Sequence, residues 1–140
     1  MTVSFYFKQP VTLKNRNALK AFIESLFKSE KVKAEQVTYI FCSDDELLNI
    51  NKEFLKHDFY TDIITFDLSD SRISPKKGDI YISVDRVKDN ARVYDLSISK
   101  ELHRVIIHGI LHLCGYKDKS AKEIKLMRFK EDLYLSKYGF

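Results

Sequence analysis

Residues 97–114 (SISKELHRVIIHGILHLC) constrain the fold most, because they predict a helix that is apolar on most of its sides. Its aliphatic residues are Leu102, Val105, Ile106, Ile107, Ile110, Leu111 and Leu113. A helix that is hydrophobic nearly all round has to be buried among other elements. Gly115 is expected to end it, because glycine readily adopts the left-handed conformation found after helix C-termini. The rest of the chain must therefore fold around this helix.

The other segments alternate predicted strands and predicted helices. Strands are expected where β-branched and aromatic residues cluster, at residues 2–7, 36–42, 61–68 and 78–84. Helices are expected from helical spacing or capping sequences, at residues 15–31, 43 to about 54, 85–94 and from 120 onward. Residues 70–77, which include Pro75, are expected to form a polar loop. The pattern predicts an α+β fold in one domain, residues 1–140, with a single mixed sheet of about four strands packed with about five helices.

Composition limits the class of protein. Apolar residues make up 44% of 140 residues, which is enough for a folded core. The sequence has no apolar run of membrane-spanning length, and its N-terminus has no secretory signal pattern. Cys42 and Cys114 are far apart and form no C-x-x-C pair, which favours a reducing compartment over a disulfide-bonded secreted domain. We therefore expect a cytoplasmic protein without membrane contact.

The net charge of +4 is unevenly distributed. Residues 1–34 contain seven Lys or Arg and two Glu, and residues 117–140 contain seven Lys or Arg and four acidic residues, so the centre is acidic. Basic ends suit a polyanion such as RNA. Solvated helix faces in a lysine-rich protein would give the same charge pattern, so charge alone does not choose between the two interpretations.

Two histidines and an aspartate form the pattern with the clearest chemical meaning. His108 and His112 stand four residues apart on the predicted helix, so both imidazoles leave one face, as two ligands of one metal ion must. A turn at Gly115 would bring Asp118 within reach as a third ligand. Three protein ligands leave a fourth position for water, as in catalytic zinc sites, where zinc lowers the pKa of that water towards about 7.

Each of these residues also has a structural interpretation. A lone histidine on an apolar helix is more often a core residue, and aspartate is common after a helix end, but the pair at i, i+4 favours a metal. His103 lies about 140° round the helix from His108 and is interpreted as structural, or as a residue that supports the site from behind. Cys114 is interpreted as a small buried residue.

Gly109 argues against a peptidase of the H-E-x-x-H type. In those enzymes the residue after the first histidine is the glutamate general base, and here that position is glycine. A metalloprotease therefore remains only a third interpretation. Phosphodiester hydrolysis relies more on metal activation and charge stabilisation, so it suits this pattern better.

Residues 108–118 (HGILHLCGYKD) resemble the signature H-G-x-L-H-L-x-G-Y-D-H of the YbeY family, bacterial single-strand-specific metallo-endoribonucleases linked to rRNA maturation. Nine of its eleven positions match, counting the two free ones. The family blocks T-D-V-L-S-F and G-D-I resemble residues 61–66 (TDIITF) and 78–80 (GDI). The likeness runs from about residue 37 to 118 in the same order, and the first block is the specific one.

This resemblance implies a zinc-dependent endoribonuclease with one zinc ion and a metzincin-like placement of the metal-site helix. It implies single-stranded RNA, rRNA in particular, as substrate in rRNA maturation and ribosome quality control, with ribosomal particles or proteins as partners in the cytoplasm. The three metal histidines of the family correspond to His108, His112 and the position of Asp118. A carboxylate is a legitimate zinc ligand, but its charge makes the metal a weaker Lewis acid. The family's arginine six residues before the T-D block is Leu55 here.

Four further residues are candidates for the site. Asp62 is a catalytic candidate, with a structural role at the start of the strand as its alternative, and Lys56, Lys117 and Lys119 are candidates for binding phosphate. His57, next to Lys56, is a second replacement for the missing arginine, although neither offers its bidentate fork.

Two matters stay open at the level of sequence. Tyr60 and Tyr116 are the aromatic residues considered for stacking on RNA bases, and Tyr116 is rather expected to pack after the Gly115 turn. The alternative function is a ribosome-assembly or RNA-binding factor with little or no catalytic activity, which the absent arginine favours.

Overall fold

The computed structural model describes residues 1–71 and 73–140, and residue 72, inside the predicted loop, lies outside the described residues. The strands are β1 (Thr2–Phe7), β2 (Ala34–Cys42), β3 (Ile63–Asp67) and β4 (Lys76–Ser83). The helices are α1 (Arg16–Ser29), α2 (Asp44–Leu55), α3 (Val84–Val93), α4 (Ile98–Leu113) and α5 (Ala121–Tyr138). The element types and their order agree with the sequence prediction.

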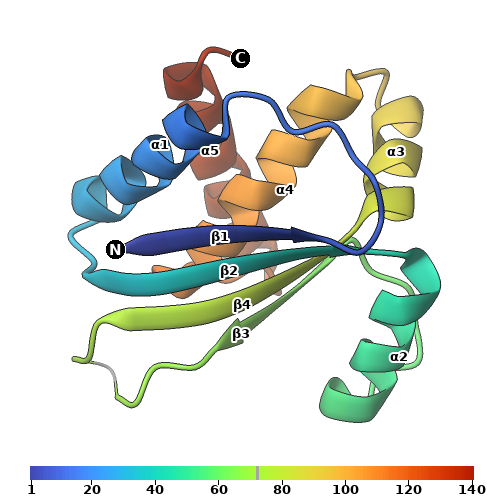
Figure 1. Cartoon of the computed structure of the whole chain (residues 1–140), viewed down its shortest axis with the longest axis horizontal. Coiled ribbons are helices and arrows are strands. Elements are labelled where there is room, and N and C mark those ends of the chain that lie inside the picture. The colour runs from blue at the N-terminus through green and yellow to red at the C-terminus, as the bar shows by residue number, and fades with distance from the viewer. Residues whose placement is uncertain (72) are drawn as a thin grey trace.

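The strands form one mixed sheet in the order β1-β2-β4-β3 (Figure 1). β1, β2 and β4 are parallel, with Val3 opposite Val37 and Val37 opposite Gly78. β3 runs antiparallel to β4 at the edge, with Ile64 opposite Tyr81. The predicted α+β fold with a single mixed sheet is thereby confirmed.

Helix α4 lies along one face of the sheet, with α1, α3 and α5 on the same side (Figure 1). Tyr39 of β2 is fully buried beneath α4, and its hydroxyl donates to the Ile106 carbonyl at 2.9 Å. Two glycines allow this close approach: a Cβ at Gly109 would lie 2.9 Å from Ile80 Cδ1, and one at Gly78 would lie 2.8 Å from Leu113 Cδ1. The central, buried position expected for this helix is confirmed.

Helix α2 covers part of the opposite face, where a smaller cluster of Cys42, Leu47 and Ile64 is buried. This helix begins at an N-cap, because the Ser43 hydroxyl accepts from the Glu46 N–H at 3.2 Å. The Glu46 side chain pairs with Lys8 at 3.4 Å instead of completing the predicted capping box. The box at Ser120 and Glu123 that opens α5, in contrast, is complete.

Three predicted boundaries move in β3, in β4 and at the start of α3. Strand β3 begins at Ile63 instead of residue 61, because Thr61 and Asp62 form the approach to the strand, where the Asp62 carbonyl accepts from the Ser83 N–H at 2.9 Å. β4 begins two residues earlier than predicted, at Lys76, and Val84 is the first residue of α3. Within the described residues, every helix is too short or too polar to cross a membrane.

Candidate metal centre

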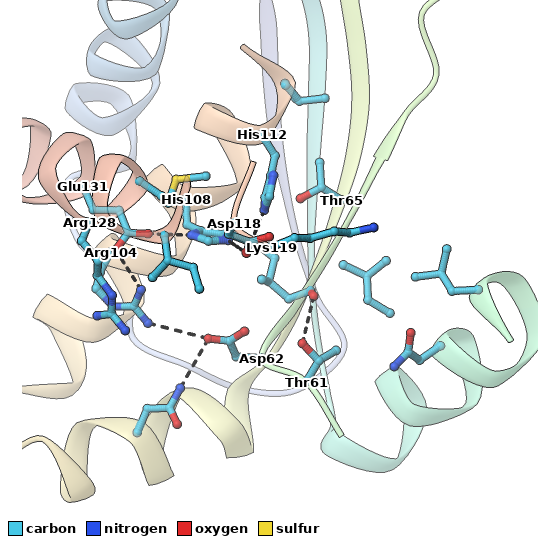
Figure 2. Close-up of a pocket in the computed structure, with 18 of the residues that line it drawn as sticks. Thr61, Asp62, Thr65, Arg104, His108, His112, Asp118, Lys119, Arg128 and Glu131 are labelled. Carbon is cyan, nitrogen blue, oxygen red and sulfur yellow. Dashed lines mark hydrogen bonds and ion pairs between the residues drawn. The ribbon is translucent and has the colours of Figure 1, made fainter. Parts of the chain in front are cut away.

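The side chains of His108, His112 and Asp118 converge at one point beside the sheet (Figure 2). The Asp118 Oδ2 lies 3.2 Å from His108 Nε2 and 3.4 Å from His112 Nε2. One ligand atom from each of the three residues lies within 4.8 Å of the others. Ligands held about 2.0–2.1 Å from a tetrahedral zinc ion are separated by about 3.3 Å, so the spacing and the donor types fit such an ion.

The turn after α4 brings Asp118 to this point. Gly115 has φ of +103°, the left-handed region that its lack of a Cβ makes accessible. The Gly115 N–H donates to the His112 carbonyl and the Tyr116 N–H donates to the Leu111 carbonyl, both at 3.0 Å. These two bonds form a Schellman motif, which ends the helix and reverses the chain. The sequence prediction placed the turn and its glycine correctly.

Both histidines direct Nδ1 away from the cluster. His108 Nδ1 lies 2.6 Å from Glu131 Oε2, and His112 Nδ1 lies 2.9 Å from the Tyr116 carbonyl. An acceptor at Nδ1 selects the tautomer with the proton on that nitrogen and leaves the Nε2 lone pair for a metal. Burial, and then the neighbouring His108, lower the pKa of His112 and so favour the neutral form that binds metals.

Glu131 of α5 holds His108 in place, although the sequence analysis did not single it out. Its side chain is 1% exposed. Burial by itself raises the pKa of Glu131, but the hydrogen bond with His108 and the positive charge of Arg104 outweigh it and lower the pKa. The sequence of α5 contains a pattern that could have identified Glu131. Met127, Glu131 and Leu135 recur every four residues on the buried face of the helix, and Glu131 is the charged residue among these three.

Arg104 links this carboxylate to others around the site. Its guanidinium lies 3.0 Å from Glu131 Oε1, 2.5 Å from Glu101 Oε2 and 3.7 Å from Asp62 Oδ2. Glu101 is fully buried and Arg104 is only 14% exposed. Because Arg104 is surrounded by three carboxylates, it orients them around the site and is not free to bind an anion.

Asp62 points into the same cavity from the approach to β3 (Figure 2). Asn90 Nδ2 lies 3.4 Å from its Oδ2. Burial raises the pKa of the Asp62 carboxyl, and the opposing effects of Arg104 and His108 do not cancel this rise. The carboxyl can therefore exchange a proton at a higher pH than an ordinary aspartate.

The cavity around these groups has a volume of about 780 Å³ and opens to solvent. Over the described residues its lining includes Lys119 but neither Lys56 nor Lys117. The Lys56 ammonium instead caps the end of α2 by donating to the Glu53 carbonyl at 3.2 Å. Arg128 of α5, which the sequence analysis did not select, also lines the cavity. Lys119 and Arg128 are thus the lining cations that form no ion pair among the described residues.

Of the remaining candidates, His57 lines the cavity, whereas His103, Cys114, Tyr60 and Tyr116 are not among the described lining residues. His103 is buried and stacks on Tyr138, with ring centroids 5.2 Å apart, and its Nδ1 lies 2.6 Å from the Ser99 carbonyl. Cys114 is half-buried, and burial raises its pKa to about 12. The Tyr60 hydroxyl donates to Asp45 at 3.2 Å, and that of Tyr116 donates to Glu30 at 2.6 Å. Each of these contacts is structural.

This fold and this site define a class: small α+β proteins with three candidate metal ligands on and after a central helix. The family model described as Endoribonuclease YbeY matches residues 6–139. A relative of that name from Cytophaga hutchinsonii is 49% identical over 134 residues, which cover 94% of this chain and 93% of the relative. Another from Flavobacterium johnsoniae is 45% identical, with coverage of 93% and 92%. The chain belongs to the Endoribonuclease YbeY family.

A solved structure supports the fold. The solution structure of a Thermotoga maritima protein is similar with a TM-score of 0.63 and 31% sequence identity, and the match covers 98% of this chain and 89% of that one. The family relationship confirms the resemblance drawn from residues 108–118, and nothing in the comparisons favours a binding factor without catalysis.

Proposed function

We propose that this protein is a metal-dependent endoribonuclease that cuts single-stranded RNA in the cytoplasm, with rRNA as the substrate in rRNA maturation and ribosome quality control. Ribosomal particles or proteins are its proposed partners. The observation that carries the proposal is the convergence of two imidazoles and a carboxylate inside an open cavity, in a chain whose relatives are named endoribonucleases.

His108, His112 and Asp118 are the proposed ligands of one Zn²⁺ ion. A divalent cation held there would polarise a phosphoryl oxygen and acidify a water molecule. Glu131 and the Tyr116 carbonyl keep both Nε2 atoms turned towards the ion by accepting from the Nδ1 atoms. The carboxylate of Asp118 adds a negative charge that lowers the Lewis acidity of the site relative to three histidines.

Asp62 is the proposed proton-transfer group. Its carboxyl faces the cavity, and its raised pKa suits a group that accepts a proton from an attacking oxygen and returns it to the leaving oxygen. Lys119 and Arg128 are proposed to contact the phosphates that flank the cleaved bond, because both line the cavity and neither forms an ion pair with the residues that the structure describes. Lys56 and Lys117 have no place in this scheme.

The first test is the substitution His112→Ala, with the metal content of the purified protein and the cleavage of single-stranded RNA as separate measurements. We expect the metal to be lost and cleavage to fall by more than the roughly 10–100-fold typical of residues behind the ligands. Chelation of wild-type protein should have the same effect, reversible on adding metal.

The matched control is His103→Phe, which changes another histidine of α4 but preserves its stacking on Tyr138. It should keep both metal and cleavage. Cleavage that survives His112→Ala or chelation would contradict the proposal. RNA binding by a wild-type protein that never cuts RNA would point instead to the alternative of a binding factor.

A further inference from the structure

The loop that follows α2 forms one wall of the cavity. Leu55, His57 and Phe59 all line it, and all three are exposed. Phe59 retains 56% of its accessible surface, although it is a large apolar residue beside a polar site. Such exposure gives the folded chain little hydrophobic stabilisation from this side chain. The exposed ring is therefore available to a ligand that enters the cavity.

His57 and Phe59 present their rings as a pair. The ring centroids lie 5.1 Å apart and the planes differ by 19°, so the two rings are stacked on one another. Both side chains are exposed, so the stacked pair is accessible, and a flat aromatic ligand can extend such a stack. A nucleobase has that shape, and bases stack on aromatic side chains in most single-strand-binding sites.

A single buried residue fixes this loop. Asn51, 2% exposed, accepts from the His57 N–H through its backbone carbonyl at 3.1 Å, and its side-chain amide donates to the Phe59 carbonyl at 2.9 Å. Lys56, which precedes His57, takes the left-handed backbone conformation, with φ of +57°. The backbones of both ring-bearing residues are thus hydrogen-bonded to the same asparagine. Because the loop is already held in place, less conformational entropy is lost when a ligand binds.

The α5 side of the cavity has a different character. Arg128 contributes positive charge there, with no ion-pair partner among the described residues. Figure 2 shows Arg128 on the α5 side, while the candidate metal ligands lie in the middle of the cavity. An unpaired nucleotide offers a base to one wall and a phosphate to the other, whereas a base in a duplex has both faces covered by its neighbours.

We propose that His57 and Phe59 form a stacking platform for one unpaired nucleobase next to the phosphate held at the candidate metal centre. This platform gives the site its preference for single strands. The inference rests on the proposed function, since it takes RNA as the ligand, and it adds the part of the cavity that recognises a base.

The test measures binding of a single-stranded RNA of about six nucleotides that carries one 2-aminopurine, a base whose fluorescence falls when it stacks. An RNA with the same phosphates but an abasic site at that position is the second probe. All proteins carry Asp62→Asn, which removes the proposed proton-transfer carboxyl so that the RNA is not cut and keeps the three candidate metal ligands. The variants are Phe59→Ala, Phe59→Trp and, as the matched control, Phe129→Ala, which removes an equally exposed phenyl ring of α5 outside the cavity lining.

We expect Phe59→Ala to weaken binding of the base-bearing RNA by about five- to a hundredfold and to leave the abasic RNA unaffected. The abasic RNA should bind the parent protein as weakly as the base-bearing RNA binds Phe59→Ala. Fluorescence quenching should persist in Phe59→Trp and Phe129→Ala and vanish in Phe59→Ala.

The platform is overturned if the parent protein and Phe59→Ala bind the base-bearing RNA with the same affinity, and if that affinity equals the one for the abasic RNA. This outcome is separate from failure of the proposed function, which shows as a wild-type protein that does not cut RNA. If the wild-type protein cuts RNA while Phe59→Ala binds both probes normally, the nuclease stands and the platform falls. If the protein neither cuts nor binds RNA, both are overturned.

Discussion

The two walls of the cavity are built in opposite ways. On the α4–α5 wall, the polar groups behind the candidate ligands are buried and paired with each other, as in the chain of contacts from His108 through Glu131 to Arg104. On the wall after α2, the rings of His57 and Phe59 are exposed, and hydrogen bonds between their backbones and Asn51 hold them in position.

The difference shows what each wall has to hold. An ion requires donor atoms fixed within fractions of an ångström, and buried partners supply that rigidity. A single-stranded nucleic acid presents the flat faces of its bases, so the protein needs only to hold an aromatic ring in place and leave it exposed. The predictions below separate the two walls experimentally.

The largest effect is expected at Glu131. Glu131→Gln keeps an acceptor for His108 but removes the charge, and Glu131→Met removes both, so metal affinity should fall about tenfold and about a hundredfold respectively. Competition with a chromophoric chelator measures this affinity. Asp132→Asn, an exposed neighbour on α5, is the control. A folded Glu131→Met protein with wild-type affinity would show that the buried wall does not tune the ligands.

A smaller effect is expected at Asn51. Asn51→Ala removes the donor to the Phe59 carbonyl, so the free energy of unfolding should drop by about 1 kcal/mol, while metal affinity should not change. Urea unfolding measures the loss. Asn49→Ala, at an exposed position of the same helix, should change stability by no more than about 0.5 kcal/mol. If the two variants lose the same stability, Asn51 does not pin the loop.

The smallest effect concerns pH and His103, which faces away from both walls. Burial lowers the pKa of His103 in the folded chain, and the bond with the Ser99 carbonyl offsets only part of this. Below about pH 6.5, the ordinary histidine pKa, His103 therefore binds a proton more readily in the unfolded chain than in the folded one. The contribution of neutral His103 to the free energy of unfolding is complete above that pH, and it is lost as the pH falls through the pKa of His103 in the folded chain.

Urea unfolding of metal-free protein at two pH values, about one unit above and one unit below the ordinary histidine pKa, tests this. His103→Phe should lose less stability between them than the wild type does. The rest of the chain is the same in both proteins, so its contribution cancels in the comparison. An identical loss in both would rule out His103 as a contributor.

The sequence was most informative where the relevant contacts are local. The spacing of His108 and His112 and the glycine at 115 determine geometry within about one helical turn, so the converging ligands could be predicted. Glu131 could not be placed, because its contact with His108 depends on how α5 packs on α4, and neither helix encodes that angle by itself.

The same limit explains the loop after α2. Its ring-bearing residues reach the cavity because of the left-handed Lys56 and the buried Asn51, two features that periodicity does not reveal. The sequence analysis names Tyr60 as a residue that could stack on RNA bases, whereas its neighbour Phe59 is the one that lines the cavity. The strand edges moved by two residues for the related reason that sheet pairing sets them.

The tight contact between Gly109 and Ile80 also limits the chemistry that evolution can reach from this fold. The glutamate of an H-E-x-x-H peptidase at position 109 would place its Cβ 2.9 Å from Cδ1 of the fully buried Ile80, so either the Ile80 side chain or α4 would have to shift. A shift of α4 would move the helix that carries both histidines. In a lineage with this packing, that glutamate would therefore require a compensating change around Ile80.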